Sequence, residues 1–213
     1  MSPSSVAADI GGERVELLGA RALFWPARRR LLIADLHLGK ADIFRSAGIA
    51  LPRGGTRHDL DRLSALANAC GANEIWVLGD MLHGAANDSH WRAGWIAWRE
   101  QHHALRIAVL TGNHDRALAS AGLDVELLGE AIDDGPFALR HAPRTHSHLH
   151  VICGHLHPRI PLPGVPGRWP VFWLRAGCTV LPAFSEFTGG SEPLREPSDR
   201  LVVCVDDAAL ALP

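Results

Sequence analysis

The sequence Thr111-Gly112-Asn113-His114-Asp115 directly follows the apolar run Ile107-Ala108-Val109-Leu110, and the fold prediction starts from this stretch. A short aliphatic run that ends at Gly-Asn-His-Asp is typical of a buried strand with a polar loop at its carboxyl end. Asn supplies a neutral oxygen ligand, His supplies a titratable nitrogen, and Gly allows close backbone approach. Taken alone, the same residues would also suit an ordinary turn.

Four further segments repeat this arrangement of an apolar run followed by polar residues. They are Asp35-Leu36-His37, Gly79-Asp80, His141 and Gly154-His155-Leu156-His157. In an extended strand tip, residues i and i+2 point the same way, so the Asp-x-His and His-x-His pairs can each hold a ligand from one side. Among the histidines between 141 and 150 we choose His141, because it ends a predicted strand whereas the others precede one.

The donor atoms of these segments indicate metal binding. Carboxylate, imidazole and amide ligands suit Mn, Fe or Zn, and the lack of cysteine argues against a structural zinc site. Seven ligands are too many for one ion and fit two, with Asp80 as the natural bridge. Two ions ~3.5–4 Å apart can hold a bridging hydroxide and position a phosphate for in-line attack. His114 is then free to protonate the leaving oxygen as general acid. The seven predicted ligands are Asp35, His37, Asp80, Asn113, His141, His155 and His157.

Apolar spacing predicts the elements that carry these motifs. Strands are expected at 15–18, 22–25, 31–34, 74–78, 107–110, 125–128, 137–141, 150–153, 171–174 and 201–205. Helices are expected from Thr56, where a capping box with Asp59 is predicted, from Asp88, where Trp91, Trp95 and Trp98 form a core stripe, and at 116–121. This order predicts a helix-flanked parallel portion continued by a largely antiparallel one. The polar strand ends should meet at one edge.

Length and composition limit the remaining possibilities. A chain of 213 residues fits one domain spanning 1–213, and 47% apolar residues suffice for a core. The net charge of −2 gives no global attraction to nucleic acid or membranes. Four widely spaced cysteines without a C-x-x-C pair fit reduced thiols, and neither a signal peptide nor a run of ~20 apolar residues is present. We therefore expect a cytoplasmic protein with no membrane partner.

The ordered motifs D-x-H, G-D, G-N-H-D, a lone His and G-H-x-H resemble those of the calcineurin-like metallophosphoesterases, over Asp35 to His157. The resemblance implies an α/β (α+β) sandwich of two mixed β-sheets flanked by helices. It also implies that one divalent ion is held by Asp35, His37, Asp80 and His157, and the other by Asp80, Asn113, His141 and His155. His114 would face the substrate. Motif two continues as Met81-Leu82-His83-Gly84, without the acid and arginine of phosphoprotein phosphatases, which argues against that activity.

A narrower resemblance covers almost the whole chain. The runs 24–26, 34–40, 47–52 and 181–190 look like those of the ligase-associated DNA damage response endonuclease subfamily. This resemblance implies a DNA phosphodiester substrate, usually manganese as the metal, a link to DNA repair and a functional association with an ATP-dependent DNA ligase. A hydrolase for small nucleotides or phosphomonoesters is the nearest alternative. A non-catalytic scaffold is a further one, although a scaffold would be expected to have lost ligands.

Three basic or histidine features are secondary candidates. Lys40, the only lysine, follows the first ligand pair and is a candidate for contacting phosphate as a point charge. His83, three residues after Asp80, is a second candidate for substrate binding. For Lys40, a solvated side chain is the alternative interpretation. The run Arg28-Arg29-Arg30 suits either a patch that binds a nucleic-acid backbone or, more simply, a solvated turn.

Overall fold

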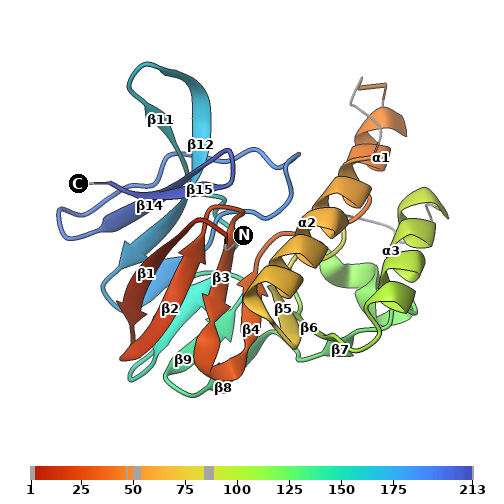
Figure 1. Cartoon of the computed structure of the whole chain (residues 1–213), viewed down its shortest axis with the longest axis horizontal. Coiled ribbons are helices and arrows are strands. Elements are labelled where there is room, and N and C mark those ends of the chain that lie inside the picture. The colour runs from red at the N-terminus through yellow and green to blue at the C-terminus, as the bar shows by residue number, and fades with distance from the viewer. Residues whose placement is uncertain (1–2, 47, 50–53, 84–88, 213) are drawn as a thin grey trace.

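The computed structural model describes residues 3–46, 48–49, 54–83 and 89–212, and two β-sheets form its centre (Figure 1). The first sheet has the order β1 (Ser5–Ile10), β2 (Glu13–Leu18), β3 (Ala22–Trp25), β4 (Arg30–Ile33), β5 (Glu74–Leu78), β6 (Arg106–Leu110) and β7 (Glu126–Leu127). The second has the order β15 (Ala208–Ala211), β14 (Arg200–Val205), β12 (Val165–Arg175), β13 (Cys178–Val180), β10 (His150–Cys153), β9 (Phe137–Arg140) and β8 (Ala131–Asp134), with β11 (Arg159–Leu162) paired to β12.

The strands β4 to β7 are parallel to one another, whereas β1 to β4 are antiparallel. Strand β4 is buried on both faces, which explains the continuous apolar sequence from Leu31 to Ile33. Leu31 and Ile33 face the layer of α2 (Gly55–Cys70) and α3 (Ser89–Gln101), while Leu32 faces the second sheet. Figure 1 shows these two helices covering one side of the first sheet.

The second sheet is largely antiparallel, although β9, β10 and β13 are parallel neighbours. Apolar side chains of both sheets form one core between them, including the edge-to-face pair of Trp25 and Phe137, whose ring centroids lie 4.7 Å apart. The predicted sandwich of two mixed sheets flanked by helices is therefore confirmed. The strands β1, β8, β11, β13 and β15 are additional to the prediction. The edge strands β1, β8 and β15 are partly exposed and carry a weak apolar pattern.

The tryptophan stripe of α3 packs in the core as predicted, since Trp91, Trp95 and Trp98 are each 2–4% exposed. Asp88, where this helix was expected to start, lies outside the described residues. The helix predicted near residue 116 is a 3₁₀ helix, η2 (Asp115–Ser120). A further helix, α1 (Lys40–Ser46), follows motif one, and residues 47 and 50–53 after it lie outside the described part of the chain.

The predicted capping box of α2 is wrong. Gly54 is the N-cap residue and makes no side-chain capping bond. The hydroxyl of Thr56 instead lies 3.4 Å from the backbone nitrogen of Gly39, and Asp59 pairs with Arg62 inside the helix at 3.0 Å. Thr56 is therefore used for a tertiary contact, which a local sequence pattern cannot anticipate, and Asp59 is used for a pair within the helix.

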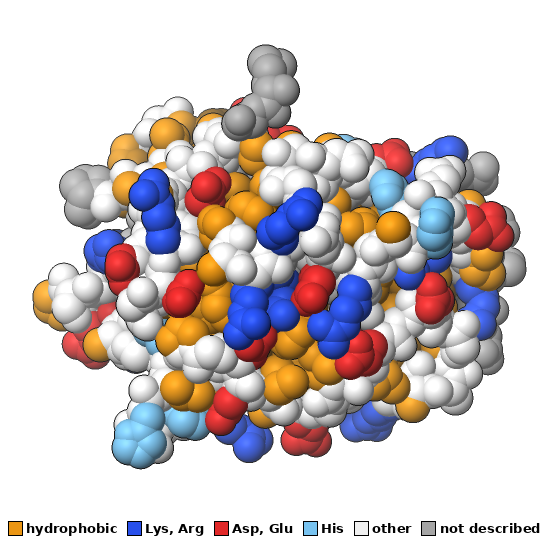
Figure 2. All heavy atoms as spheres, turned by 60° about the horizontal axis from the view of Figure 1, so that its bottom comes forward, with side chains coloured by type: hydrophobic (Ala, Val, Ile, Leu, Met, Phe, Trp, Pro, Cys, Tyr) orange, Lys and Arg blue, Asp and Glu red, His pale blue; other side chains and the backbone are white. Residues whose placement is uncertain are grey.

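The basic turn at residues 28–30 is solvated only in part, since Arg28 and Arg29 are exposed whereas Arg30 is not. Arg30 is buried, lies 3.6 Å above the ring of Trp76 and pairs with Glu74 at 2.8 Å. Arg28 and Arg30 both pair with Asp134. Figure 2, in which the bottom of Figure 1 comes forward, shows positive and negative side chains interspersed on this face. Arg28 and Arg30 are therefore paired with carboxylates at the end of the sheet opposite to the motif loops, whereas Arg29 donates to the carbonyl oxygen of Gly71.

No helix within the described ranges is both long and apolar enough to span a membrane.

Candidate metal centre

The motif loops follow the carboxyl ends of β4, β5, β6, β9 and β10, and backbone hydrogen bonds join neighbouring loops. The amide of Asp35 donates to Gly79 O at 3.1 Å, and that of His37 donates to Asp80 O at 2.9 Å. On the second sheet, the amide of Gly154 donates to His141 O at 2.9 Å. The loops therefore continue the strand pairing beyond the sheets, and this brings the predicted ligands together.

Backbone strain is concentrated at these loops. Nine described residues other than glycine have positive φ angles, and five of them are predicted ligands. Such conformations are costly for residues with a Cβ and persist at functional sites, where the surrounding structure enforces them. The five residues are Asp35, His37, Asp80, His155 and His157, with φ between 46° and 69°.

Two motif glycines are needed because other residues approach them too closely for a side chain. A Cβ on Gly79 would lie 2.3 Å from Nδ1 of His141. A Cβ on Gly112 would lie 2.2 Å from Oδ1 and 2.3 Å from the backbone nitrogen of Asp80. Each glycine thus lets one motif loop pack directly against a predicted ligand from another loop.

The first group of potential ligands consists of Asp35, His37 and His157, whose donor atoms lie within 4.8 Å of one another. The Asp35 carboxylate is fully buried, and its Oδ1 lies 3.2 Å from Nε2 of His157. Both of these atoms, and both ring nitrogens of His37, are buried without a hydrogen-bond partner. Buried polar atoms are normally paired. A divalent cation would satisfy these atoms, so the residues fit a metal ion.

The second group consists of Asp80, His141 and His155, whose donor atoms also lie within 4.8 Å of one another. Nδ1 of His141 lies 3.0 Å from the carbonyl oxygen of Leu78, and if Nδ1 donates this bond, Nε2 of a neutral ring presents a lone pair. Nε2 lies 3.0 Å from both Nδ1 of His155 and Oδ1 of Asn113, and 3.4 Å from Oδ2 of Asp80. Four donor atoms therefore converge, as expected around a cation.

Electrostatics at these groups also favour a metal ion. Burial, assisted by the charge of Lys40, lowers the pKa of His37 to about 3, so this ring is neutral. Burial opposes ionisation of Asp80, but hydrogen bonds from His141 and the His114 amide lower its pKa to about 2. Burial lowers the pKa of His141, but the hydrogen bond with Asp80 and the charge of Asp80 outweigh this and raise the pKa above its ordinary value. The second group thus attracts positive charge, which a divalent ion supplies.

His114 lies at the solvent-exposed side of this centre, beside the exposed Asn113. Its amide donates to Oδ1 of Asp80 at 2.9 Å, whereas its ring stacks on that of His83 with centroids 5.0 Å apart. The His83 ring also contacts His37 edge to face at 5.1 Å. The His114 ring also contacts His37 edge to face at 5.5 Å, so both rings border the first ligand group without belonging to either group.

The other histidines near His141 lie elsewhere. His150 bonds Thr179 at 2.9 Å, and His146 lies 3.6 Å from Asp133. Sequence reasoning understated one residue, Asp115, which is buried and accepts hydrogen bonds from the amides of Leu82 at 2.8 Å and Gly112 at 2.9 Å. It ties the second motif loop to the third. Its place in the Gly-Asn-His-Asp motif was the available signal.

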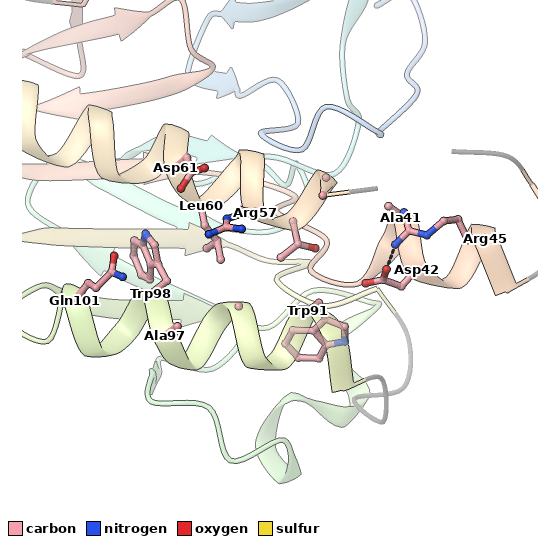
Figure 3. A pocket seen from close by; sticks show the side chains of 14 residues that line it. Ala41, Asp42, Arg45, Arg57, Leu60, Asp61, Trp91, Ala97, Trp98 and Gln101 are labelled. Atoms are coloured by element: carbon pink, nitrogen blue, oxygen red, sulfur yellow. Dashed lines mark hydrogen bonds and ion pairs between the residues drawn. The ribbon is translucent and has the colours of Figure 1, made fainter. Parts of the chain in front are cut away.

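A groove of about 810 Å³ lies apart from the predicted ligands (Figure 3). It is lined by α1, α2 and α3, with Trp91 and Trp98 on α3 opposite Arg57 and Leu60 on α2. An ion pair joins Arg45 to Asp42 at its α1 end. Because none of the predicted ligands lines this groove, we place the chemistry at the motif loops instead.

Comparison with known proteins gives a clear relative. No family model and no curated protein matches the chain. Among solved structures, the nuclease MPE of Pseudomonas putida is 34% identical, with a TM-score of 0.85, and the alignment covers 98% of this chain and 100% of the nuclease.

Two more distant structures are also similar. The phosphoesterase Yfce of E. coli is 16% identical, with a TM-score of 0.48, and the alignment covers 85% of this chain and 96% of the Yfce chain. The protein of unknown function AQ665 of Aquifex aeolicus is 17% identical, with a TM-score of 0.41, and the alignment covers 60% of this chain and 78% of the AQ665 chain. The likeness to the nuclease extends over the whole fold, and two groups of potential metal ligands lie at the motif loops. The chain therefore belongs to the family of nuclease MPE within the metallophosphoesterases, and it is a metal-dependent phosphoesterase.

Proposed function

We propose that this protein is a dinuclear, manganese-dependent nuclease that hydrolyses DNA phosphodiester bonds. The observation that carries the proposal is the pair of adjacent ligand groups, in a chain 34% identical to a nuclease over nearly its whole length. The link to DNA repair, endonucleolytic action and the functional association with an ATP-dependent DNA ligase are further parts of the proposal, and they rest on the subfamily resemblance of the sequence.

The proposal assigns the ligands as the motifs imply. Asp35, His37 and His157 would hold one ion, and His141, His155 and Asn113 would hold the other, with Asp80 shared between them. Asp80 lies in the second group, and its charge also acts on His37 in the first. When bound, two divalent ions supply an ionised water near neutral pH and neutralise the charge of the phosphate.

The residues around the ions have separate tasks. His114 would protonate the leaving oxygen, because its ring faces solvent and is not a member of either ligand group. His83 would bind substrate beside it and hold the His114 ring in place by stacking. Lys40 would bind a phosphate oxygen as a point charge. Carboxylate, imidazole and amide donors suit Mn, and also accept Fe or Zn.

The test combines metal analysis with a panel of substrates. We expect about two manganese ions per chain by calorimetry and hydrolysis of both bis-p-nitrophenyl phosphate and DNA, each abolished in Asp80→Ala. DNA cleavage by Asp80→Ala at the wild-type rate would refute the mechanism. Hydrolysis of p-nitrophenyl phosphate or free nucleotides much faster than of DNA would instead identify a phosphomonoester or small-nucleotide hydrolase. Circular substrates separate endonucleolytic from exonucleolytic action.

A further inference from the structure

The ammonium group of Lys40 lies at the edge of the metal centre. Burial lowers the pKa of Lys40, and the charges of Asp35 and Asp80 oppose this. Its Nζ donates a hydrogen bond to Oγ1 of Thr188 at 3.1 Å, and the salt bridges found among the described residues include none to Lys40. A lysine held by a neutral hydroxyl keeps its positive charge available for an anionic ligand.

Thr188 belongs to the segment 181–190, which runs beside motif one. The amide of Phe184 donates to Ala34 O at 2.8 Å, and that of Ser185 donates to Asp35 O at 3.3 Å. The ring of Phe187 packs so closely on Gly55 that a Cβ there would lie 2.3 Å away. This segment therefore follows the chain from the end of β4 to the start of α2.

Thr188 is fixed in place by burial of its side chain and by a hydrogen bond to its backbone. Its side chain is buried, with 4% of the residue exposed, and its carbonyl oxygen accepts a hydrogen bond from Arg159 at 3.0 Å. A lysine side chain is a flexible stem with a compact charge at its end. A fixed hydroxyl beside that charge restricts the positions that the ammonium group can take.

We propose that Thr188 is a positioning residue that directs the ammonium of Lys40 toward a non-bridging oxygen of the phosphate. The proposal rests on the proposed function, since it assigns a binding partner to the phosphate of that same site. It also assigns a role to the segment 181–190. A residue 148 positions from Lys40 in the chain thus completes the anion-binding side of the centre.

The substitution Thr188→Val removes the hydroxyl and preserves the shape of the side chain. We expect kcat/KM for bis-p-nitrophenyl phosphate to fall, and the inhibition constant of orthophosphate to rise, each about tenfold, as for one lost hydrogen bond to a charged group. Lys40→Gln should cost at least as much. The double variant should be no worse than Lys40→Gln, because the hydroxyl acts only through the lysine. Thr188→Ser should restore wild-type values.

Controls separate positioning from a structural effect. Thr179→Val removes another buried threonine hydroxyl, one that bonds His150, and should leave both constants unchanged. Manganese affinity and Tm should be equal in Thr188→Val and wild type. The proposal would be overturned if the losses in kcat/KM of the two single variants multiplied in the double variant. It would also be overturned if Thr188→Val had the same kcat/KM and inhibition constant as Thr179→Val.

A measurement on the wild-type protein needs no substitution. Because Lys40 is the only lysine, ¹⁵N-lysine labelling gives a single side-chain ammonium signal. We expect this signal to shift when orthophosphate is added to the zinc-loaded protein, and an unmoved signal despite bound phosphate would overturn the proposal. A wild-type protein that binds phosphate in this way but hydrolyses no diester would refute the proposed function and leave the role of Lys40 and Thr188 supported.

Discussion

Substituting Gly112 by alanine should disable the metal centre by steric pressure alone. The added Cβ would lie 2.2 Å from Oδ1 and 2.3 Å from the backbone nitrogen of Asp80. Real Cβ atoms essentially never approach a heavy atom closer than 3.0 Å. One of the two contacts is with backbone, so rotation of the Asp80 side chain cannot relieve the clash, and the two loops must separate.

The expected displacement sets the size of the effect. Reaching 3.0 Å requires a shift of about 0.8 Å at Oδ1, and a misplacement of about 1 Å in an active site can cost about 100-fold in rate. Oδ1 also accepts the His114 amide, so the same shift moves the proposed general acid. We therefore expect kcat to fall about 100-fold and manganese affinity to weaken.

The assay is hydrolysis of bis-p-nitrophenyl phosphate, with manganese titration by calorimetry and Tm measured in parallel. Gly94→Ala is the matched control, because a Cβ there meets nothing within 4 Å and Gly94 lies inside α3. It should keep full activity and gain about 0.4–1 kcal/mol of stability. Wild-type kcat and manganese affinity in Gly112→Ala would refute the reasoning, because the two loops would then be able to separate without disturbing the centre.

Three further predictions concern the proton donor, the metals and a buried acid. His114→Ala should keep its manganese and lose about 10²–10⁴-fold in kcat, whereas Asn113→Ala should lose manganese as well; equal metal loss in both would contradict the assignment of His114. Manganese at 100 times its Kd should stabilise the chelated protein by about 2.7 kcal/mol in urea unfolding, and an unchanged midpoint would exclude a native-state metal site. Burial raises the pKa of Asp59 to about 6, against the pull of Arg62, so the folded state binds this proton more tightly than the unfolded state. The contribution of this proton to the free energy of unfolding is therefore complete below pH 3.8 and is lost as pH rises to about 6. In that window the free energy of unfolding of wild type should fall by about 1 kcal/mol per pH unit relative to that of Asp59→Asn. Parallel curves of unfolding free energy against pH would contradict this.

Much of the fold was accessible from local pattern. Strands β4, β5 and β6 are apolar after their first residue because both of their faces are buried there, and such runs stand out in a sequence. The edge strand β8 was missed because solvent on its outer side permits polar residues, and β15 was missed because its four residues include three alanines and only one large apolar side chain. The capping box of α2 failed because Thr56 contacts the backbone of Gly39 and Asp59 pairs with Arg62 of the same helix.

In the candidate site, too, some features follow from local sequence and others from tertiary contacts. The sequence by itself determined the types and order of the predicted ligands, because each follows a strand whose apolar run is visible without any knowledge of its neighbours. The sequence favoured His141 over the histidines that follow it, but only the tertiary structure showed that His141 lies beside Asp80 and that Thr188 holds Lys40. It also showed that Arg30 is neutralised by Glu74. These relations join residues far apart in the chain, and local periodicity carries no information about which distant segment will supply the partner.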